Sequence, residues 1–299
     1  MKRKLRDVPA AILMLAPSLA ILAIFVFYPL GRAVFLGRQT CDATGKRCRT
    51  IGWSRYVDVF QTREFQNALG NTFKLALFTV PAGVVFGIAL AVLADKHLRG
   101  IGIFRTIFSS TVATSVAVAS LIWFVLLQPQ VGILPDLLHN IFPVLKNPGL
   151  LRDGNTALPA VAISMTWAGL GFTFIIVTAA LQSVPRELYE SAYVDGAGSW
   201  RRFTNVTLPM LSPTILFVIV VITTRAFQAY GEIDLLTQGG PNSAGRPTET
   251  VTYLVYGKTS LIKNDLGSKS TAAVLLFGVL LLLAFVQFRS LEKRVHYGS

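Results

Sequence analysis

Long apolar runs dominate this sequence and set the strictest limit on how it can fold. A helix of about twenty apolar residues spans the hydrocarbon core of a bilayer, and the chain contains several runs of about that length. Only 14% of the residues are charged and the mean hydropathy is +0.56, whereas about one quarter of a soluble protein is charged. Because lipid cannot satisfy open backbone groups, the spanning segments must be helices. We therefore predict an all-α, polytopic membrane protein.

The apolar runs predict six transmembrane helices in a single domain that covers residues 1–299. The predicted helices cover approximately residues 8–36, 70–94, 104–127, 157–182, 211–230 and 271–288. The first run is longer than the apolar core of a signal peptide, so we expect an uncleaved helix. Lys2, Arg3, Lys4 and Arg6 precede it and favour a cytoplasmic N-terminus. Six helices then place both termini in the cytoplasm and make residues 37–69 the first external loop.

The net charge of +13 invites a comparison with nucleic-acid-binding proteins. Basic residues that flank membrane helices on the cytoplasmic side explain the charge better. We therefore expect membrane lipid, and not nucleic acid, as a partner.

Cys41 and Cys48 are the two cysteines of the chain and flank a turn-forming sequence. They could form a disulfide in an oxidising compartment, with free thiols as the alternative. The three histidines are scattered, so we predict no metal site.

A polar stretch at residues 185–209 interrupts the apolar pattern between the fourth and fifth predicted helices. Pro185 can open a short helix over residues 186–194, and Gly196 and Gly198 permit a sharp bend. A second short helix should cover about residues 200–206, with Ser199 as its N-cap, and Leu208–Pro209 should end the unit. The stretch is either a solvated helical hairpin or a docking surface for a partner in the water phase.

The same stretch resembles the EAA loop of ABC-importer permeases. Glu190, Ala192, Gly196, Leu208 and Pro209 match that motif at its spacing, while Ser191 and Val206 replace its Ala and Ile. The resemblance implies the type I ABC importer permease fold and makes 185–209 a cytoplasmic coupling loop, whose first helix inserts into an ATPase subunit. The implied coupling residues are Glu187, Glu190, Ser191, Ala192, Asp195, Gly196 and Ala197.

A second segment narrows the resemblance. LLTQGGP at residues 235–241, followed by Thr248 and Tyr253, is similar to a segment of carbohydrate-importer permeases of the maltose-importer larger-permease type. The C-terminal VQFRSLEKRVHY and the ALQSVPREL before the EAA-like motif resemble the first permease of glycerol-3-phosphate importers. The third predicted helix departs from the pattern, because SSTVATSVAVASLIW lacks the proline often found near its start. The resemblance therefore leaves the kink of that helix undecided.

In these relatives the substrate lies midway through the membrane, against the helices on either side of the EAA loop. The resemblance carries substrate contact over to Met165, Gly169, Phe172, Ile222, Arg225 and Ala226. Arg225 is the most informative, because a guanidinium within a membrane helix is costly and usually faces a cavity or a partner. It could bind phosphate oxygens in bidentate fashion. The alternative is an arginine near a helix end that snorkels or pairs with Glu232 or Asp234, and Met165 and Phe172 could equally be packing residues.

The resemblance implies a non-catalytic permease subunit of an ATP-driven importer for a glycerol-3-phosphate, glycerophosphodiester or carbohydrate solute. The chain lacks a phosphate-binding loop: Gly257, Lys258 and Thr259 give the right ending, but position 252 is Thr rather than Gly. We therefore expect no cofactor on this chain, with ATP and Mg on a partner. The implied partners are a second homologous permease, two ATPase subunits and an extracytoplasmic substrate-binding protein, in a bacterial cytoplasmic membrane.

The alternatives are a permease for a neutral oligosaccharide such as trehalose or maltose, and an ABC permease for amino acids or polyamines. The LTQGGP segment speaks against the latter. A secondary transporter driven by an ion gradient would tend to carry intramembrane carboxylates, and a membrane enzyme would need a nucleophile or a metal cluster.

Overall fold

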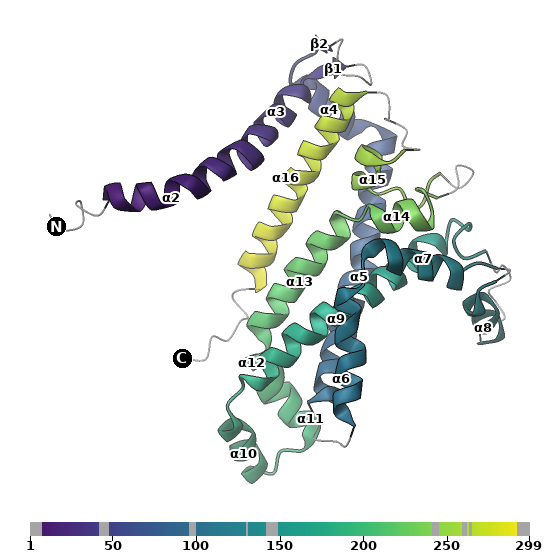
Figure 1. Cartoon of the computed structure of the whole chain (residues 1–299). Coiled ribbons are helices and arrows are strands. Elements are labelled where there is room, and N and C mark those ends of the chain that lie inside the picture. Colours follow the sequence, from purple (N-terminus) through teal and green to yellow (C-terminus); the bar gives the residue numbers. More distant parts are fainter. Residues whose placement is uncertain are drawn as a thin grey trace.

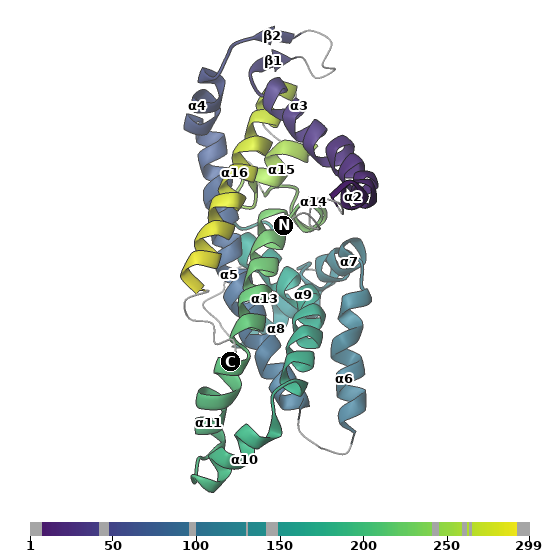
Figure 2. The same ribbon diagram turned by 90° about the vertical axis from the view of Figure 1, so that its left-hand side faces the viewer.

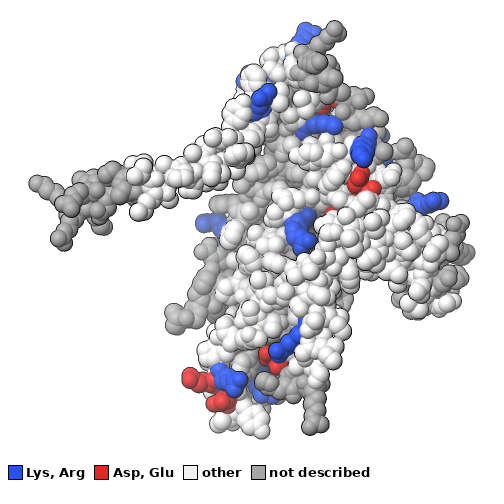
Figure 3. Space-filling view, in the orientation of Figure 1, with Lys and Arg blue, Asp and Glu red and all other residues white. Residues whose placement is uncertain are grey.

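The chain is described from a computed structural model over residues 8–41, 48–95, 100–129, 131–141, 149–240, 245–258, 262 and 265–291. In these ranges four helices are long and apolar enough to cross a membrane, and two bent helix pairs raise the number to six if each pair is one span. Charged side chains gather toward the two ends of the body, and the face between them is largely uncharged (Figure 3). The predicted all-α, polytopic membrane architecture is confirmed.

The first apolar run forms an arm that leaves the body of the molecule (Figures 1 and 2). It consists of α2 (Val8–Leu22), one π-helical segment η1 (Ala23–Phe27) and α3 (Tyr28–Leu36), close to the predicted bounds. The arm is apolar on all sides, and residues 12–29 are all exposed within the chain. Only the end of α3 returns to the body, where it packs against α16 (Leu266–Leu291).

Three long helices form the centre: α5 (Arg63–Ala94), α9 (Ala157–Gln182) and α13 (Ser212–Phe227). Two glycines of α5 let its neighbours approach closely. A Cβ on Gly83 would lie 3.0 Å from Ile222 Cδ1 of α13, and a Cβ on Gly87 would overlap Thr173 Cγ2 of α9. These two glycines therefore permit close packing of α5 against α9 and α13.

The helix α5 begins at Arg63, although the apolar run predicts a start near residue 70. Its N-cap is Thr62, whose Oγ1 accepts a hydrogen bond from the Phe65 N–H at 3.3 Å. A cap of this kind satisfies one of the unpaired N–H groups of the first turn. Hydrophobicity marks only the part of a helix that matches the lipid, so the polar first turns escaped the prediction.

The predicted third helix is not one continuous helix. The structure has α6 (Ile101–Ser110), a 3₁₀ turn η2 (Thr111–Ala113) and α7 (Val116–Leu126), bent by 107°. Thr114 and Ser115 have extended backbones, and Ser115 restarts the helix by accepting the Val118 N–H at 3.3 Å. Serine capping thus breaks the helix without a proline. Gly171 of α9 accommodates the bend, because a Cβ there would lie 2.7 Å from Val112 N.

The polar stretch forms α10 (Arg186–Val194), as predicted, and then a second helix with different ends. α11 (Ser199–Arg202), the π-helical η3 (Phe203–Thr207) and α12 (Leu208–Met210) run on continuously and bend by 68° into α13. Leu208–Pro209 therefore does not end the unit, because proline is tolerated at the start of a helical turn. The N-cap is Gly198, and Ser199 is already helical.

A small cap closes the end of the body opposite α10 (Figure 1). β1 (Gln39–Cys41) pairs antiparallel with β2 (Cys48–Thr50), and a disulfide joins Cys41 to Cys48. The helix α4 (Ser54–Gln61) follows, so residues 37–69 are largely structured. Asp265, just before α16, ties these pieces together: it pairs with Arg55 of α4 and its Oδ1 accepts the Cys41 N–H at 3.2 Å.

Three short helices complete the described chain: α8 (Ile133–Ile141), α14 (Gly231–Leu236) and α15 (Val251–Tyr256). α8 lies between the third and fourth predicted spans. α14 and α15 lie in a segment predicted only as external. α16 begins earlier than predicted, at Leu266, and ends at Leu291.

Candidate functional site

The helix α10 lies at the tip of the molecule (Figure 2), and none of its residues is buried. Among the predicted coupling residues, Ala192 and Ala197 are half-buried and the others are exposed. Three large side chains nearby are also open, namely Tyr193 (71%), Val194 (84%) and Trp200 (76%). Sequence reasoning missed these three. Their signal was the presence of bulky apolar residues in a stretch that is otherwise polar.

The turn after α10 has a fixed geometry. Gly196 has φ +73°, a left-handed conformation that suits glycine. The Ala197 N–H donates to Ala192 O at 2.9 Å and the Gly196 N–H donates to Tyr193 O at 3.0 Å. This pair of bonds is a Schellman C-cap. The predicted bend therefore depends on Gly196, while Gly198 has φ −65°.

Side chains connect α10 to the helix that leads back to the core. The Tyr189 hydroxyl and Thr207 Oγ1 share a hydrogen bond of 3.1 Å, and the Arg202 guanidinium lies 5.7 Å from the centre of the Tyr193 ring. Thr207 is buried in the segment that bends into α13. The Tyr189–Thr207 hydrogen bond therefore connects α10 directly to the helix that continues into the central bundle.

A small cavity lies between the central helices. Its volume is about 30 Å³, and four of the predicted pathway residues line it: Met165, Gly169, Ile222 and Arg225. The remaining lining residues are Thr79, Gly83, Thr166 and Glu232. Phe172 lies outside this lining, 6.4 Å from Phe217 between ring centres. Ala226 also lies outside it, buried in a core cluster with Phe227.

Arg225 and Glu232 are the two charged groups in this lining. Arg225 lies in the last turn of α13, and among the described residues it forms no ion pair within 4.0 Å. Burial raises the pKa of the Glu232 carboxyl, and a backbone hydrogen bond and the charge of Arg225 partly oppose this. The arrangement offers a cation and a carboxylate to one small solute.

The described residues 235–240 and 245–253 are held in place by buried polar contacts. Arg246 Nε pairs with Glu249 Oε2 at 2.8 Å, and both side chains are almost fully buried. Asn71 of α5 donates to the carbonyl oxygens of both residues at 3.2 Å. Arg246 also donates to Gln238 O at 3.3 Å. Sequence reasoning missed this ion pair although its partners are only three residues apart, because its burial depends on the contact with Asn71 of the distant α5.

Comparison with known proteins identifies the family of this chain. Residues 83–297 match the family described as binding-protein-dependent transport system inner membrane component. The chain belongs to this permease family. It is 33% identical over 287 residues to the sn-glycerol-3-phosphate transport system permease protein UgpA of Agrobacterium fabrum, with 96% of each chain covered. It is 32% identical over 286 residues to the protein of the same name from Brucella abortus, with 95% of each covered.

Solved structures confirm the type I ABC importer permease fold. The permease superposes with a TM-score of 0.77 on a chain of a bacterial alginate ABC transporter in complex with an alginate pentasaccharide-bound periplasmic protein. The identity is 23%, over 96% of this chain and 95% of that one. The predicted importer-permease family is thus confirmed, and the chain is a multi-pass membrane protein.

The permease also carries a polar cluster around Asp265, apart from the small cavity. Within the described ranges, no three His, Cys, Asp or Glu side chains are grouped to hold a metal ion. The Asp265 cluster is structural: Ser268 Oγ donates to Asp265 Oδ2 at 2.7 Å, and the Thr271 hydroxyl donates to Gly37 O at 2.8 Å. These bonds fasten the start of α16 to the hairpin and to the end of α3.

Proposed function

We propose that this permease forms half of the transport pathway of an ATP-driven importer for glycerol-3-phosphate or a related glycerophosphodiester. The observation that carries the proposal is Arg225 in the cavity between the central helices, next to Glu232. A guanidinium can hold two phosphate oxygens at once, and a carboxylate can accept hydrogen bonds from glycerol hydroxyls. The two UgpA relatives are named for transport of the same solute.

The cavity of about 30 Å³ holds roughly one water molecule. The solute can therefore occupy it only after α5, α9 and α13 move apart. We infer that binding and release accompany a conformational cycle that is driven from another subunit, since this chain lacks a phosphate-binding loop. ATP and Mg would be held by that partner, and this chain would perform no covalent chemistry.

The proposed contact with the ATPase is α10. Its exposed residues combine carboxylates, Glu187 and Glu190, with the bulky apolar Tyr193 and Val194. Such a mixed surface suits a cleft on a soluble partner, with large anchors at its centre and polar groups at its rim. The Tyr189–Thr207 bond then transmits displacement of α10 toward α13. Coupling would thus pass from a water-exposed helix to the cavity.

The proposed contact with a second, homologous permease includes the arm of α2 and α3. Side chains such as Leu13, Met14 and Phe25 are more than two-thirds exposed within this chain. Lipid alone could cover them, but an isolated helix that leaves its own bundle also offers a packing surface to another subunit. A binding protein would deliver the solute on the opposite side from α10.

The proposed orientation places the disulfide-bonded hairpin outside and α10 in the cytoplasm. Disulfides persist in oxidising compartments, and the hairpin and α10 lie at opposite ends of the molecule (Figure 1). Both termini would then be cytoplasmic in a bacterial cytoplasmic membrane. The basic residues 2–6 that favour this orientation lie outside the described residues.

The deciding experiment is uptake into proteoliposomes that contain the complete transporter, its binding protein and internal ATP with Mg. The solutes are glycerol-3-phosphate, glycerophosphocholine, trehalose and maltose. ATP-dependent uptake of the phosphorylated solutes is expected. Uptake of the neutral sugars alone would refute the phosphate assignment, and uptake that continues without ATP would refute the importer assignment.

A further inference from the structure

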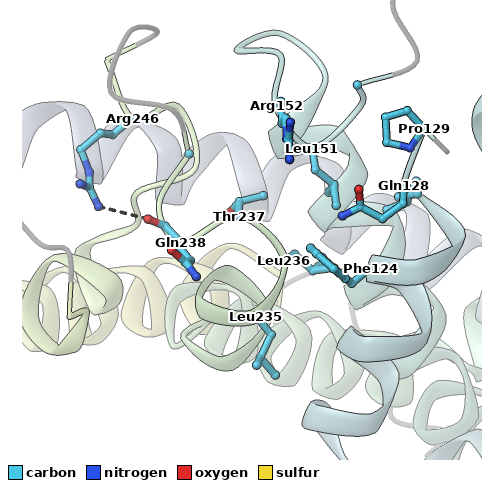
Figure 4. A pocket seen from close by; sticks show the side chains of 13 residues that line it. Phe124, Gln128, Pro129, Leu151, Arg152, Leu235, Leu236, Thr237, Gln238 and Arg246 are labelled. Carbon is cyan, nitrogen blue, oxygen red and sulfur yellow. Dashed lines mark hydrogen bonds between the residues drawn. The ribbon is translucent and has the colours of Figure 1, made fainter. Parts of the chain in front are cut away.

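A second, larger pocket opens beside α14, away from the cavity described above (Figure 4). Its volume is about 610 Å³, within the range of small-molecule sites. Its walls come from three separate parts of the chain: the end of α7, the loop before α9, and α14 with the turn that follows. We call it the outer pocket.

The described lining of the outer pocket is basic and rich in hydrogen-bonding groups. It contains Arg152 and Arg246 and, among the described lining residues, no carboxylate. Arg246 is already paired with Glu249. Arg152 is exposed and forms no ion pair with any described residue. Its guanidinium is therefore the cation that can receive an anion from solution.

Amide and hydroxyl groups surround this charge. Gln128 at the end of α7 and Gln238 after α14 line the pocket from different sides, with Thr237 between them (Figure 4). Amides and hydroxyls both donate and accept hydrogen bonds, as polyol recognition requires. Leu235 and Leu236 add an apolar wall. The chemistry fits a small polyol that carries one anionic group.

The helix α14 separates the outer pocket from the inner cavity. Glu232, in its first turn, lines the inner cavity. Leu235 and Leu236, at its other end, line the outer pocket. In this conformation the outer pocket is open and the inner cavity is almost closed, so an arriving solute finds the outer pocket first.

We propose that the outer pocket is a separate binding site for an anionic polyol phosphate, which it holds before the solute passes α14. Arg152 binds the phosphate, and the Gln128 amide and Thr237 hydroxyl bind the glycerol hydroxyls. This proposal rests on the proposed function for its ligand class. Its location does not depend on Arg225, which belongs to the inner cavity.

The test measures binding of glycerol-3-phosphate to the complete transporter in lipid nanodiscs, without the binding protein and without ATP. Omitting the binding protein removes any effect of the variants on its docking. The variants are Arg152→Ala, Arg152→Lys and the control Arg49→Ala, an exposed arginine on β2. Saturation-transfer NMR detects weak binding, and a titration gives Kd.

We expect Arg152→Ala to raise Kd about tenfold or more, since it removes hydrogen bonds to a charged group. Arg152→Lys should recover part of the affinity, because it keeps the charge without the planar fork. Arg49→Ala should leave Kd unchanged. An unchanged Kd in Arg152→Ala, or no binding by the unmodified transporter, would overturn the outer-pocket site.

These outcomes are distinct from failure of the proposed function. If the transporter takes up glycerol-3-phosphate but Arg152→Ala binds it normally, the outer-pocket site is wrong and the transport function stands. If proteoliposomes take up neutral sugars alone, the phosphate assignment fails, and the outer pocket fails with it as an anion site.

Discussion

Arg225 of α13 and Glu232 of α14 line one small cavity, although a break between two helices separates them in the chain. Glu232 is partly buried, whereas Arg225 is exposed. Their guanidinium and carboxylate are not in ion-pair contact within the described chain. The proposed function therefore assigns both groups to a solute that carries an anionic group and hydroxyls.

Replacing Arg225 tests this interpretation. Arg225→Ala should lower uptake of glycerol-3-phosphate about tenfold to one hundredfold, because a hydrogen bond to a charged group contributes about 1.5–3 kcal/mol. Any neutral sugar that the system carries should be affected less. Initial uptake rates in proteoliposomes provide the measurement, and Gln228→Ala, an exposed neighbour, is the control. Equal losses for both solute classes would remove the phosphate argument.

The turn after α10 predicts a coupling defect. Gly196→Val forces a branched side chain into a left-handed conformation, at a cost of about 1–2 kcal/mol. We expect the α10 surface to shift and transport-stimulated ATPase activity to fall severalfold or more, while the protein remains in the membrane. Gly198→Ala is a matched control, because its φ is −65° and a Cβ there meets nothing within 4 Å. Normal ATPase stimulation in Gly196→Val would contradict the coupling role.

Helix packing at Gly87 predicts a stability difference. Gly87→Ala places a methyl group against Thr173 of α9 and should destabilise the permease by about 1–3 kcal/mol through overpacking. Gly278→Ala in α16, where a Cβ meets nothing within 4 Å, should be neutral or stabilising by up to about 1 kcal/mol. The measurement is thermal unfolding of the purified protein in detergent. Similar melting temperatures for both variants would show that α5 and α9 can separate at no cost.

The cap predicts a pH dependence of stability. Burial raises the pKa of Asp265, but hydrogen bonds from Ser268 and Cys41 and the charge of Arg55 outweigh it, so the pKa lies below its ordinary value. The folded state then binds a proton less readily than the unfolded state. The ionised Asp265 carboxylate therefore stabilises the fold fully above the ordinary aspartate pKa. This stabilisation disappears as the pH falls through the lowered pKa.

Asp265→Asn should therefore melt at a lower temperature than the unmodified permease at pH 7, and the difference should shrink as the pH falls below about 4. Asp58→Asn, an exposed carboxylate on the neighbouring α4, should change the melting temperature little at either pH. A difference for Asp265→Asn that stays constant as the pH falls from about 4 to about 2 would mean that the charge of Asp265 contributes nothing to the cap.

Several elements could be read from the residues in advance. The bounds of α9 and α10 agree with their predictions residue for residue, because an uninterrupted apolar run and a proline start are local signals. The third span could not be read in this way. Its break at Thr114 and Ser115 depends on a serine cap and on the space that Gly171 leaves in another helix.

The spans, the polar coupling stretch and the family were already determined by the order of the residues, since length, hydrophobicity and motif spacing are properties of short segments. The small cavity with Arg225 and Glu232 and the outer pocket at Arg152 were decided only by folding, as was the burial of the Arg246–Glu249 pair against Asn71. Both cavities are lined by segments far apart in the chain, and Asn71 of α5 meets residues 246–249 only in the folded bundle. The helix bends and close glycine contacts that bring them together depend on the packing of the whole bundle.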